Sequence, residues 1–352
     1  MRGPAAGFAP FTERRDDESG LLDLKGVVHC HSYLSHDSKG RIEDIAAACK
    51  NVGIDFVVMT DHQTPHSVAR GRRGFVDQTL FVVGAEMRAP DGTLLAFPLR
   101  HYVRPKPTTA EIIADIHAQG GLAFVGHAER YATWTTDGLG GIEIVNLHAA
   151  AQAANKPELA LKGLFMANRD LWYSLTDRPA QNLLRYDEQI RARGPMAAIA
   201  GNDAHENVKI FGPLGGTIGT YEELFKVLTT HVLAERCDED AVVDAFRQGR
   251  TYVVFDLYRD GTGFQFFARR GAQRWLMGDS VASADQLELV VRCPDRGRLQ
   301  LFCDGKIVQE SRGSELVWNR PEPGMYRVEV LRPSGTPWIW SSAIRVEPEH
   351  VE

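Results

Sequence analysis

Two histidines one residue apart, His29 and His31, end a short apolar run, and their types and spacing could do chemistry. In a β-strand alternate side chains point to the same side, so both imidazoles would project together and Cys30 would point the other way. Two imidazoles held side by side on rigid backbone are the beginning of a transition-metal site. The spacing alone is a weak indication, so the prediction depends on further ligands at corresponding places along the chain.

Further metal-capable side chains follow, and most of them come at or just after the end of an apolar run of strand length. Asp37 lies in the loop that follows the first run. The runs at 54–60, 80–85, 122–126, 142–146 and 196–201 lead in turn to His62, Glu86, His127, His148, and Asp203 with His205. This recurrence changes the two histidines from an isolated pair into part of a larger set.

The elements between these runs predict how the set is brought together. Helical patterns are predicted at 41–52, 108–119, 158–173, 180–193, 221–231 and 238–248. Strands that alternate with helices indicate βαβ units and a largely parallel sheet. An open sheet would spread six strand ends along a line, whereas a (β/α) barrel brings them onto one ring at its active-site face. We therefore predict an α/β fold with a closed or nearly closed barrel.

The pattern changes near residue 260, where short β-type runs separated by turn residues replace the alternation. No helix is predicted there, and the runs indicate a small antiparallel β-sandwich. We predict an extended lead-in at 1–23, the barrel at 24–258 and the sandwich at 259–352.

Composition narrows the class of protein. A hydrophobic content of 43% and a charged content of 24% are typical of a globular protein, and the net charge of −6 gives no general attraction to long nucleic acid or anionic membrane. The five cysteines include no CxxC spacing, which favours reduced thiols in the cytosol. The first twenty residues contain no apolar signal segment, and no apolar run is long enough to cross a bilayer. The chain as written is predicted to be cytoplasmic.

A mixed set of imidazoles and carboxylates suits Zn, Mn or Fe better than Mg or Ca. Nine ligands are too many for one ion, so we expect two or three ions that share a bridging carboxylate. Glu86 is the natural bridge, because it is the one glutamate that ends a predicted strand. Clustered ions supply metal-activated hydroxide, which phosphoester hydrolysis uses best, although other hydrolyses remain open. The chain has no GxSxG motif, P-loop or Rossmann fingerprint.

The order of these motifs resembles the PHP (polymerase and histidinol phosphatase) superfamily over roughly residues 24–255. The motifs are His29-Cys30-His31, Asp37, Thr60-Asp61-His62, Gly84-Ala85-Glu86, Gly126-His127 and Asn202-Asp203-Ala204-His205. The helix at 238–248 with Gly249-Arg250-Thr251-Tyr252 after it, and the C-terminal stretches 325–329 and 337–339, are most similar to the CehA/McbA branch.

The resemblance implies a distorted, TIM-like (β/α)7 barrel with a trinuclear metal site. One ion would take His29, His31, Glu86 and Asp203; a second would share Glu86 and add His127 and His148; a third would take Asp37, His62 and His205. The residues expected to carry catalysis are His29, His31, His62, Glu86, Asp203 and His205. Asp61 is expected to orient a neighbouring group and not to bind metal directly.

A phosphate substrate needs cationic groups near the ions, and Arg88, Arg130 and Arg169 are the candidates. The expected function is a metal-dependent phosphoesterase that cleaves a small phosphorylated metabolite or a nucleotide. The alternative is an ester, amide or carbamate hydrolase that uses the same cluster. A non-catalytic binding module is disfavoured, because all nine predicted ligand positions hold ligand-capable residues. The expected partner is a small molecule, with no membrane and no long nucleic acid; the sequence does not indicate the oligomeric state.

Overall fold

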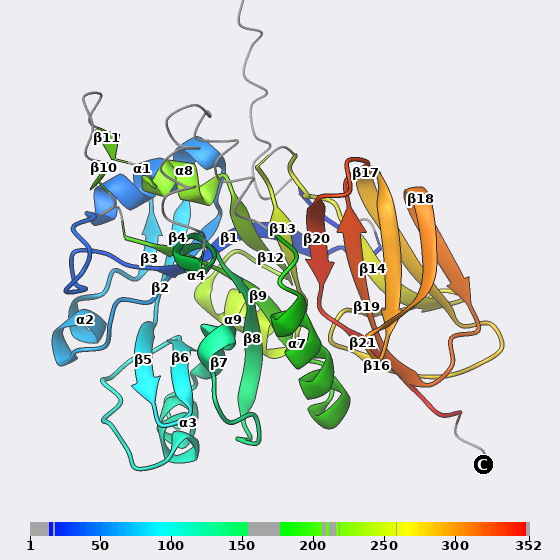
Figure 1. The fold of residues 1–352 in the computed structure, drawn as a ribbon, viewed down its shortest axis with the longest axis horizontal. Coiled ribbons are helices and arrows are strands. Elements are labelled where there is room, and N and C mark those ends of the chain that lie inside the picture. Colours follow the sequence, from blue (N-terminus) through cyan, green and yellow to red (C-terminus); the bar gives the residue numbers. More distant parts are fainter. Residues whose placement is uncertain are drawn as a thin grey trace, which may run out of the picture.

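A computed structural model describes residues 14–16, 18–153, 177–205, 209–210, 216–217, 219–257 and 259–349 (Figure 1). The predicted helix at 158–173, and with it Arg169, lies outside the described residues.

The strands that bear the ligand candidates, together with β4 and β6, form one mixed sheet. They are β1 (Leu22–Cys30), β2 (Phe56–Met59), β4 (Thr79–Val83), β5 (Ala85–Ala89), β6 (Gly92–Phe97), β7 (Leu122–Gly126), β8 (Leu139–Asn146) and β9 (Ala197–Ala204). Parallel pairs join β2 to β1 and β4, β1 to β9, β9 to β8, and β8 to β7. β6 is antiparallel to both of its neighbours, β5 and β7. The short strand β3 (Gly74–Val76) adds to β4, and β10 (Lys209–Ile210) pairs with β11 (Gly216–Thr217).

The helices begin and end where local chemistry predicts. α1 (Ile42–Val52) ends at Gly53, whose left-handed φ of 77° closes the helix. α3 (Thr109–His117) begins with a capping box between Thr108 and Glu111. The remaining described helices are α2 (Pro65–Arg70), α4 (Leu147–Ala153), α7 (Ala180–Arg193), α8 (Tyr221–Phe225), α9 (Glu239–Arg247) and the 3-10 turn η2 (Ala128–Arg130). None of the helices in the described part of the chain is long and apolar enough to span a membrane.

The predicted helix at 221–231 is wrong beyond its first turn and a half. α8 ends at Phe225, and Leu228–Ala234 forms strand β12, which lies between β1 and β13 (Thr251–Phe255) and is antiparallel to both. The β-branched residues Thr229, Thr230 and Val232 favour a strand. As a strand, this segment also forms backbone hydrogen bonds with β1 on one edge and β13 on the other, and these bonds join the three segments together. β1 also begins earlier than predicted, at Leu22, because it has this extra partner.

The C-terminal strands are antiparallel in the main, as predicted. They are β14 (Gln265–Arg270), β15 (Gln273–Leu276), β16 (Ser280–Ala282), β17 (Glu288–Cys303), β18 (Lys306–Asn319), β19 (Gly324–Leu331), β20 (Pro337–Ser341) and β21 (Ile344–Glu347). β20 pairs with β19 on one edge and with β13 on the other, so hydrogen bonds connect these strands to the mixed sheet. The domain boundaries given above stay a prediction.

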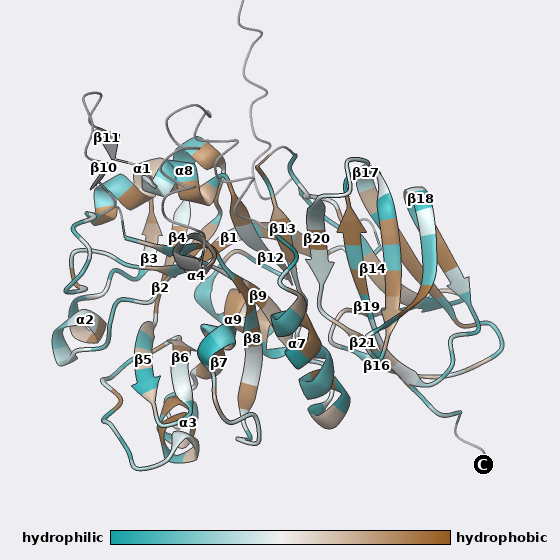
Figure 2. Cartoon of the chain, in the orientation of Figure 1, coloured by the Kyte–Doolittle hydropathy of each residue, from teal (hydrophilic) through white to brown (hydrophobic). Residues whose placement is uncertain are grey.

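The central strands contain runs of hydrophobic residues (Figure 2), and their side chains are buried on both faces. Val57 packs in one buried cluster beneath the helices, whereas its neighbour Val58 packs in a second cluster with Phe97, Phe124 and Phe246. The Phe97 and Phe124 rings stack at 4.7 Å, and Phe246 of α9 meets both edge-on. A strand buried on two faces is held rigidly, which suits it to carry functional side chains at its end.

The structure confirms the α/β class but not a TIM-like (β/α)7 barrel. An all-parallel barrel requires a helix between every two strands, whereas a tight turn at Pro90–Asp91 joins β5 to β6 here, and β6 therefore runs antiparallel. β1 also has three strand partners. Its first half pairs with β12, and its second half pairs in parallel with β2 and β9.

Candidate metal centre

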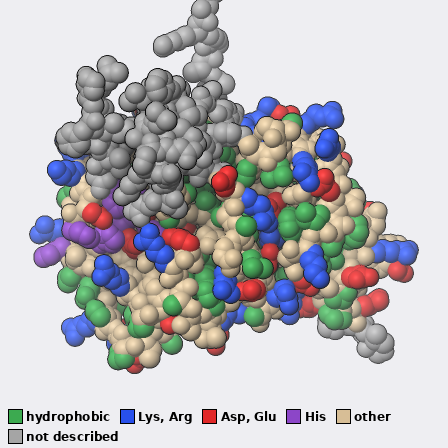
Figure 3. Space-filling view, viewed as in Figure 1, with side chains coloured by type: hydrophobic (Ala, Val, Ile, Leu, Met, Phe, Trp, Pro, Cys, Tyr) green, Lys and Arg blue, Asp and Glu red, His purple; other side chains and the backbone are tan. Residues whose placement is uncertain are grey.

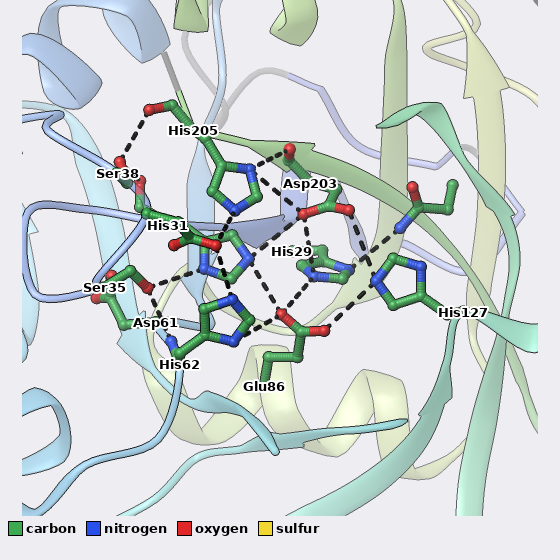
Figure 4. Close-up of polar contacts among 12 residues, drawn as sticks. His29, His31, Ser35, Ser38, Asp61, His62, Glu86, His127, Asp203 and His205 are labelled. Carbon is green, nitrogen blue, oxygen red and sulfur yellow. Dashed lines mark hydrogen bonds and ion pairs between the residues drawn. The ribbon is translucent and has the colours of Figure 1, made fainter. Parts of the chain in front are cut away.

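The predicted ligands converge at one end of the mixed sheet (Figure 4). His29 lies at the end of β1, with His31 just beyond it. His62 follows β2, Glu86 lies in β5, and His127 follows β7. Asp203 lies in β9, and His205 follows that strand. The prediction that strand ends would bring these side chains together is therefore met by the geometry.

Three of these residues have a strained backbone. His29, His127 and Asp203 have positive φ values of 63°, 48° and 51°, in the left-handed region that non-glycine residues rarely adopt. At His29 the register with both neighbouring strands shifts, so the residue is bulged out of regular pairing. The two histidines face the same site through this bulge and not through simple alternation. Such strain costs about 1–3 kcal/mol per residue and clusters at functional sites.

Glu86 is the centre of the cluster. Its Oε2 lies 3.4 Å from Nε2 of His29, 3.4 Å from Nε2 of His31 and 3.2 Å from Nδ1 of His62. Its other oxygen, Oε1, lies 3.4 Å from Nε2 of His127. One carboxylate thus faces four imidazoles from three separate segments, which is the arrangement expected of a bridge.

Asp203 provides a second carboxylate on the opposite side of the same imidazoles. Its Oδ1 lies 3.5 Å from Nε2 of His29 and 3.4 Å from Nε2 of His31, and its Oδ2 lies 3.6 Å from Nε2 of His127. Asp37 completes the set from the loop after β1, with Oδ2 2.9 Å from Nε2 of His62 and 3.3 Å from Nε2 of His205. Asp37 and His62 are each about one-third exposed, so solvent reaches the cluster from their side.

Most of these histidines have Nδ1 engaged outside the cluster, which turns Nε2 inward. Nδ1 of His29 lies 2.6 Å from Glu143, Nδ1 of His31 lies 3.0 Å from the Ser35 hydroxyl, and Nδ1 of His205 lies 2.8 Å from the Asp203 carbonyl oxygen. A carboxylate or carbonyl partner requires Nδ1 to carry the proton, which leaves an Nε2 lone pair for a metal.

Two inward nitrogens provide a test of whether a metal fits. Nε2 of His29 and Nε2 of His31 are fully buried, and neither makes a hydrogen bond to any described residue. A buried polar atom without a partner is costly, and it calls for a ligand, a water or an ion. Both atoms lie 3.4–3.5 Å from the oxygens of Glu86 and Asp203, a spacing that suits two ligands of one ion better than a hydrogen bond.

The electrostatics favour positive charge at this position. Burial raises the pKa of Glu86 and Asp203, but hydrogen bonds and charge from the surrounding histidines outweigh it and hold both values well below the usual range. Burial lowers the pKa of His29, yet the carboxylates of Asp203 and Glu143 raise it well above the ordinary value. Burial instead lowers the pKa of His31 to about 4, so that this imidazole is neutral at pH 7, as a metal ligand must be.

The ligand atoms form three overlapping groups in which all members lie within 4.8 Å of one another. The groups are His29, His31 and Asp203; His29, Glu86 and His127; and His31, Asp37, His62 and His205. These groups resemble the three expected ligand sets but differ in membership: Glu86 is absent from the first, His29 joins the second, and His31 joins the third. His148 of α4 belongs to none of them; its ring lies 5.6 Å from that of His205, and its role as a ligand stays a prediction.

A fourth group, His231 with Asp256 and Asp260, lies elsewhere and has a different character. The buried ammonium of Lys25 is 3.0 Å from Asp256 and 3.5 Å from Asp260. A lysine therefore already supplies the positive charge that these two carboxylates need, and we do not count this group as a metal site.

The predicted substrate-binding arginines are less well placed. Arg88 of β5 and Arg130 of η2 are both exposed, and Arg130 Nε lies 3.9 Å from the carboxylate of Glu129. Arg169 lies outside the described residues. Histidine side chains gather at the left edge of the face shown in Figure 3. His36 is exposed, and its ring lies 4.7 Å from that of His62.

Asp61 behaves as expected of an orienting residue. Its Oδ1 accepts a hydrogen bond from the Ser32 backbone N–H at 2.6 Å, and its carboxylate also accepts the Ser32 hydroxyl. It thereby fixes the start of the loop that carries Ser35 and Asp37.

The sequence alone did not predict the residues that form hydrogen bonds to the candidate ligands from outside the cluster. Glu143 and Asn146 of β8 both approach Nδ1 of His29, and the Ser35 hydroxyl joins His31 to the backbone of His62. Tyr221 of α8 donates a hydrogen bond to the carbonyl oxygen of His31 at 2.7 Å. Glu143 gave one indication, since a glutamate inside an apolar strand needs a buried partner.

Comparison with known proteins yields weak likenesses. No protein-family model and no curated protein matches the chain. Among solved structures, it is similar to a two-domain protein from Bacteroides vulgatus that contains a predicted PHP-like metal-dependent phosphoesterase, with 14% identity, coverage of 93% of this chain and 97% of the other, and a TM-score of 0.46. It is also similar to a protein from Bifidobacterium adolescentis proposed to be a metal-dependent phosphoesterase, with 15% identity, coverage of 55% and 90%, and a TM-score of 0.33. At such scores the function must be argued from this chain's own residues.

Proposed function

We propose that this chain is a metal-dependent hydrolase that cleaves phosphoesters of a small phosphorylated metabolite or nucleotide. One observation carries the proposal: three ligand groups, which include the buried carboxylates of Glu86 and Asp203, are linked because His29 and His31 each belong to two of them. Groups that share members suit a cluster of ions better than a single ion. Two or three ions of Zn, Mn or Fe are the proposed cofactors.

When bound, such ions lower the pKa of water and neutralise charge on both the attacking and the leaving oxygen of a displacement. The residues of the chain divide the work. Glu86 and Asp203 hold negative charge at the centre, and the Nε2 atoms of His29 and His31 point inward as the nitrogen ligands that would bind the ions. Asp37, His62 and His205 form the group nearest solvent, and we propose that substrate enters on their side.

A phosphoester is favoured because its transfer requires charge neutralisation over several oxygens, which a cluster supplies in one place. Ester, amide or carbamate hydrolysis needs only one polarised carbonyl. Arg88 and Arg130 remain candidates for contact with a phosphate, and no membrane or long nucleic acid is proposed as a partner.

We also propose that the mixed sheet closes on itself. If β4 and β5, which are separated by Gly84 alone, are counted as one strand, the pairs from β1 through β2, β6, β7, β8 and β9 return to β1. This closure supports a distorted barrel of the PHP type. The similarity to the CehA/McbA branch remains a proposal from the motifs.

Chelation is expected to destabilise the protein and stop turnover. Removal of the ions would leave the buried carboxylates and unpaired imidazole nitrogens of the cluster without their partner. Ligand at 1,000 times its Kd stabilises a fold by about 4 kcal/mol, so EDTA should lower the Tm by several degrees, and added Zn²⁺ or Mn²⁺ should restore it. Thermal unfolding with elemental analysis measures this. An unchanged Tm, with no metal in the purified protein, would contradict the proposal.

A panel of substrates separates the two kinds of bond. We expect turnover of p-nitrophenyl phosphate, nucleotides or sugar phosphates, with competitive inhibition by inorganic phosphate. Hydrolysis of carboxylic esters or carbamates alone would favour the carbonyl chemistry. Replacement of His62 by alanine should abolish turnover of whichever class is cleaved, whereas exposed His66 of α2 offers a matched histidine-to-alanine control.

A further inference from the structure

Glu143 is a fully buried carboxylate in the middle of β8, and its neighbours Ile142 and Ile144 are buried as well. It cannot touch substrate, because no part of it reaches solvent. A buried charge persists only where hydrogen bonds and opposite charge compensate it. Its contacts therefore define what it does.

Both carboxylate oxygens are turned toward the metal candidates. Oε1 lies 2.6 Å from Nδ1 of His29, and Oε2 accepts a hydrogen bond from the backbone N–H of His127 at 2.6 Å. Asn146 donates its amide to Oε1 at 3.2 Å. One side chain from β8 thus holds a residue of β1 and a residue that follows β7.

The two contacts have different consequences. An ionised carboxylate can only accept, so Nδ1 of His29 must carry its proton and the lone pair must lie on Nε2, within the cluster. At His127 the contact is to the backbone, and that residue has a strained φ of 48°. The hydrogen bond helps to hold the turn that directs the imidazole of His127 toward Glu86.

Gly201 of β9 is an independent sign that the chain makes room for this carboxylate. A Cβ at position 201 would lie 1.6 Å from Oε1 of Glu143. Gly201 has an ordinary φ, so backbone conformation does not require glycine there. The glycine is explained by the path of the Glu143 side chain across β9 to His29.

We propose that Glu143 is a positioning residue for the two ligand groups that contain His29, and that the group of Asp37, His62 and His205 does not depend on it. This inference rests on the proposed metal-dependent function. His31 and His205 have their Nδ1 atoms held by Ser35 and by the Asp203 carbonyl oxygen, which Glu143 does not contact. Glu143 would therefore orient the ligands of some ions in the cluster, whereas Ser35 and the Asp203 carbonyl oxygen would orient ligands of another.

The test is the metal content of Glu143→Gln at buffered concentrations of free Zn²⁺, and separately of Mn²⁺. Glutamine keeps the shape but offers one acceptor oxygen where His29 and His127 need two. Either the His127 turn is lost, or His29 moves its proton to Nε2 and blocks the metal. We expect the affinity for the ions bound through His29 to fall by about 10–100-fold, and the affinity for the remaining ion to stay unchanged.

Two variants make the pattern specific. Asp37→Asn should give the reverse result, with the solvent-side ion weakened and the His29 groups retained. Glu188→Gln, the same substitution at a half-exposed position on α7, should leave all metal binding unchanged. If Glu143→Gln does not fold, Gly201→Ala displaces the carboxylate without removing its charge, and it should show the same selective loss.

The outcomes separate this inference from the function on which it rests. If the unmodified protein takes up neither metal, the proposed function fails. Suppose instead that the unmodified protein binds metal and is active. If Glu143→Gln then binds every ion as tightly as before, or loses all of them equally, only the proposed role of Glu143 is overturned.

Discussion

Replacing Glu86 by glutamine is expected to reduce kcat by about 10³-fold or more, which corresponds to roughly 4 kcal/mol of transition-state stabilisation. The substitution keeps the size of the side chain and removes its charge. Glu86 faces His29, His31, His62 and His127 at 3.2–3.4 Å, so an amide there would present a donor to imidazoles that need an acceptor or a shared ion. Asp203 also lies near four imidazoles, at 3.4–3.6 Å, but Glu86 approaches its four more closely.

The measurement is turnover of p-nitrophenyl phosphate together with the metal content of the same sample. We expect Glu86→Gln to lose both, because the bridge holds ions as well as charge. Glu188→Gln, on α7, is the matched control and should keep both. Retention of full metal content with more than a tenth of the activity would show that Glu86 is not the bridge.

The convergence of the candidate ligands could be predicted from sequence because their positions depend on local features. His62 and His127 directly follow runs of apolar, partly β-branched residues, and the end of a buried strand is a rigid place where a polar side chain can emerge. Parallel neighbours then bring such ends to one edge. The prediction needed only the order of strands and the types of residue at their ends.

The residues that form hydrogen bonds to the candidate ligands from outside the cluster are distant from them in the sequence. Glu143 meets His29 across 114 positions, and Tyr221 meets the His31 carbonyl across 190. Neither pair has a spacing pattern, because register between strands, and not periodicity along one, brings them together. The opening histidine pair illustrates the same limit: the bulge at His29 changes how the two imidazoles share a site, and one strand read alone predicts regular alternation.

The wrong helix at 221–231 has a related cause. Thr220 and Glu223 form a capping box that begins a helix, and the local pattern continues it. The structure ends it at Phe225, because Leu228–Ala234 gains hydrogen bonds on both edges from β1 and β13. Tertiary pairing outweighs propensity where a segment can fill a gap between two strands.

The second large effect concerns stability. Replacing Arg327 of β19 by methionine is expected to lower the free energy of unfolding by about 3–5 kcal/mol. Arg327 is almost completely buried, and its guanidinium donates to both carboxylate oxygens of Asp187 in α7, at 2.5 and 2.8 Å, and to Glu329 at 2.7 Å. Glu329 would keep Arg178, whereas Asp187 would have no other ion-pair partner among the described residues.

This ion pair joins helix α7 to strand β19 of the C-terminal strands. Its loss should loosen the contact between α7 and β19 and leave the candidate metal centre intact. Thermal or urea unfolding should show the loss, while kcat per folded molecule stays unchanged. The second variant, Arg327→Met with Asp187→Leu, removes both charges. It should regain part of the lost stability, because most of the cost of the single change is the buried carboxylate left without its counter-charge. If the double variant is as unstable as the sum of the two single ones, the buried pair is not coupled, and packing of the arginine over the Phe302 ring, 4.4 Å away, is the larger contribution.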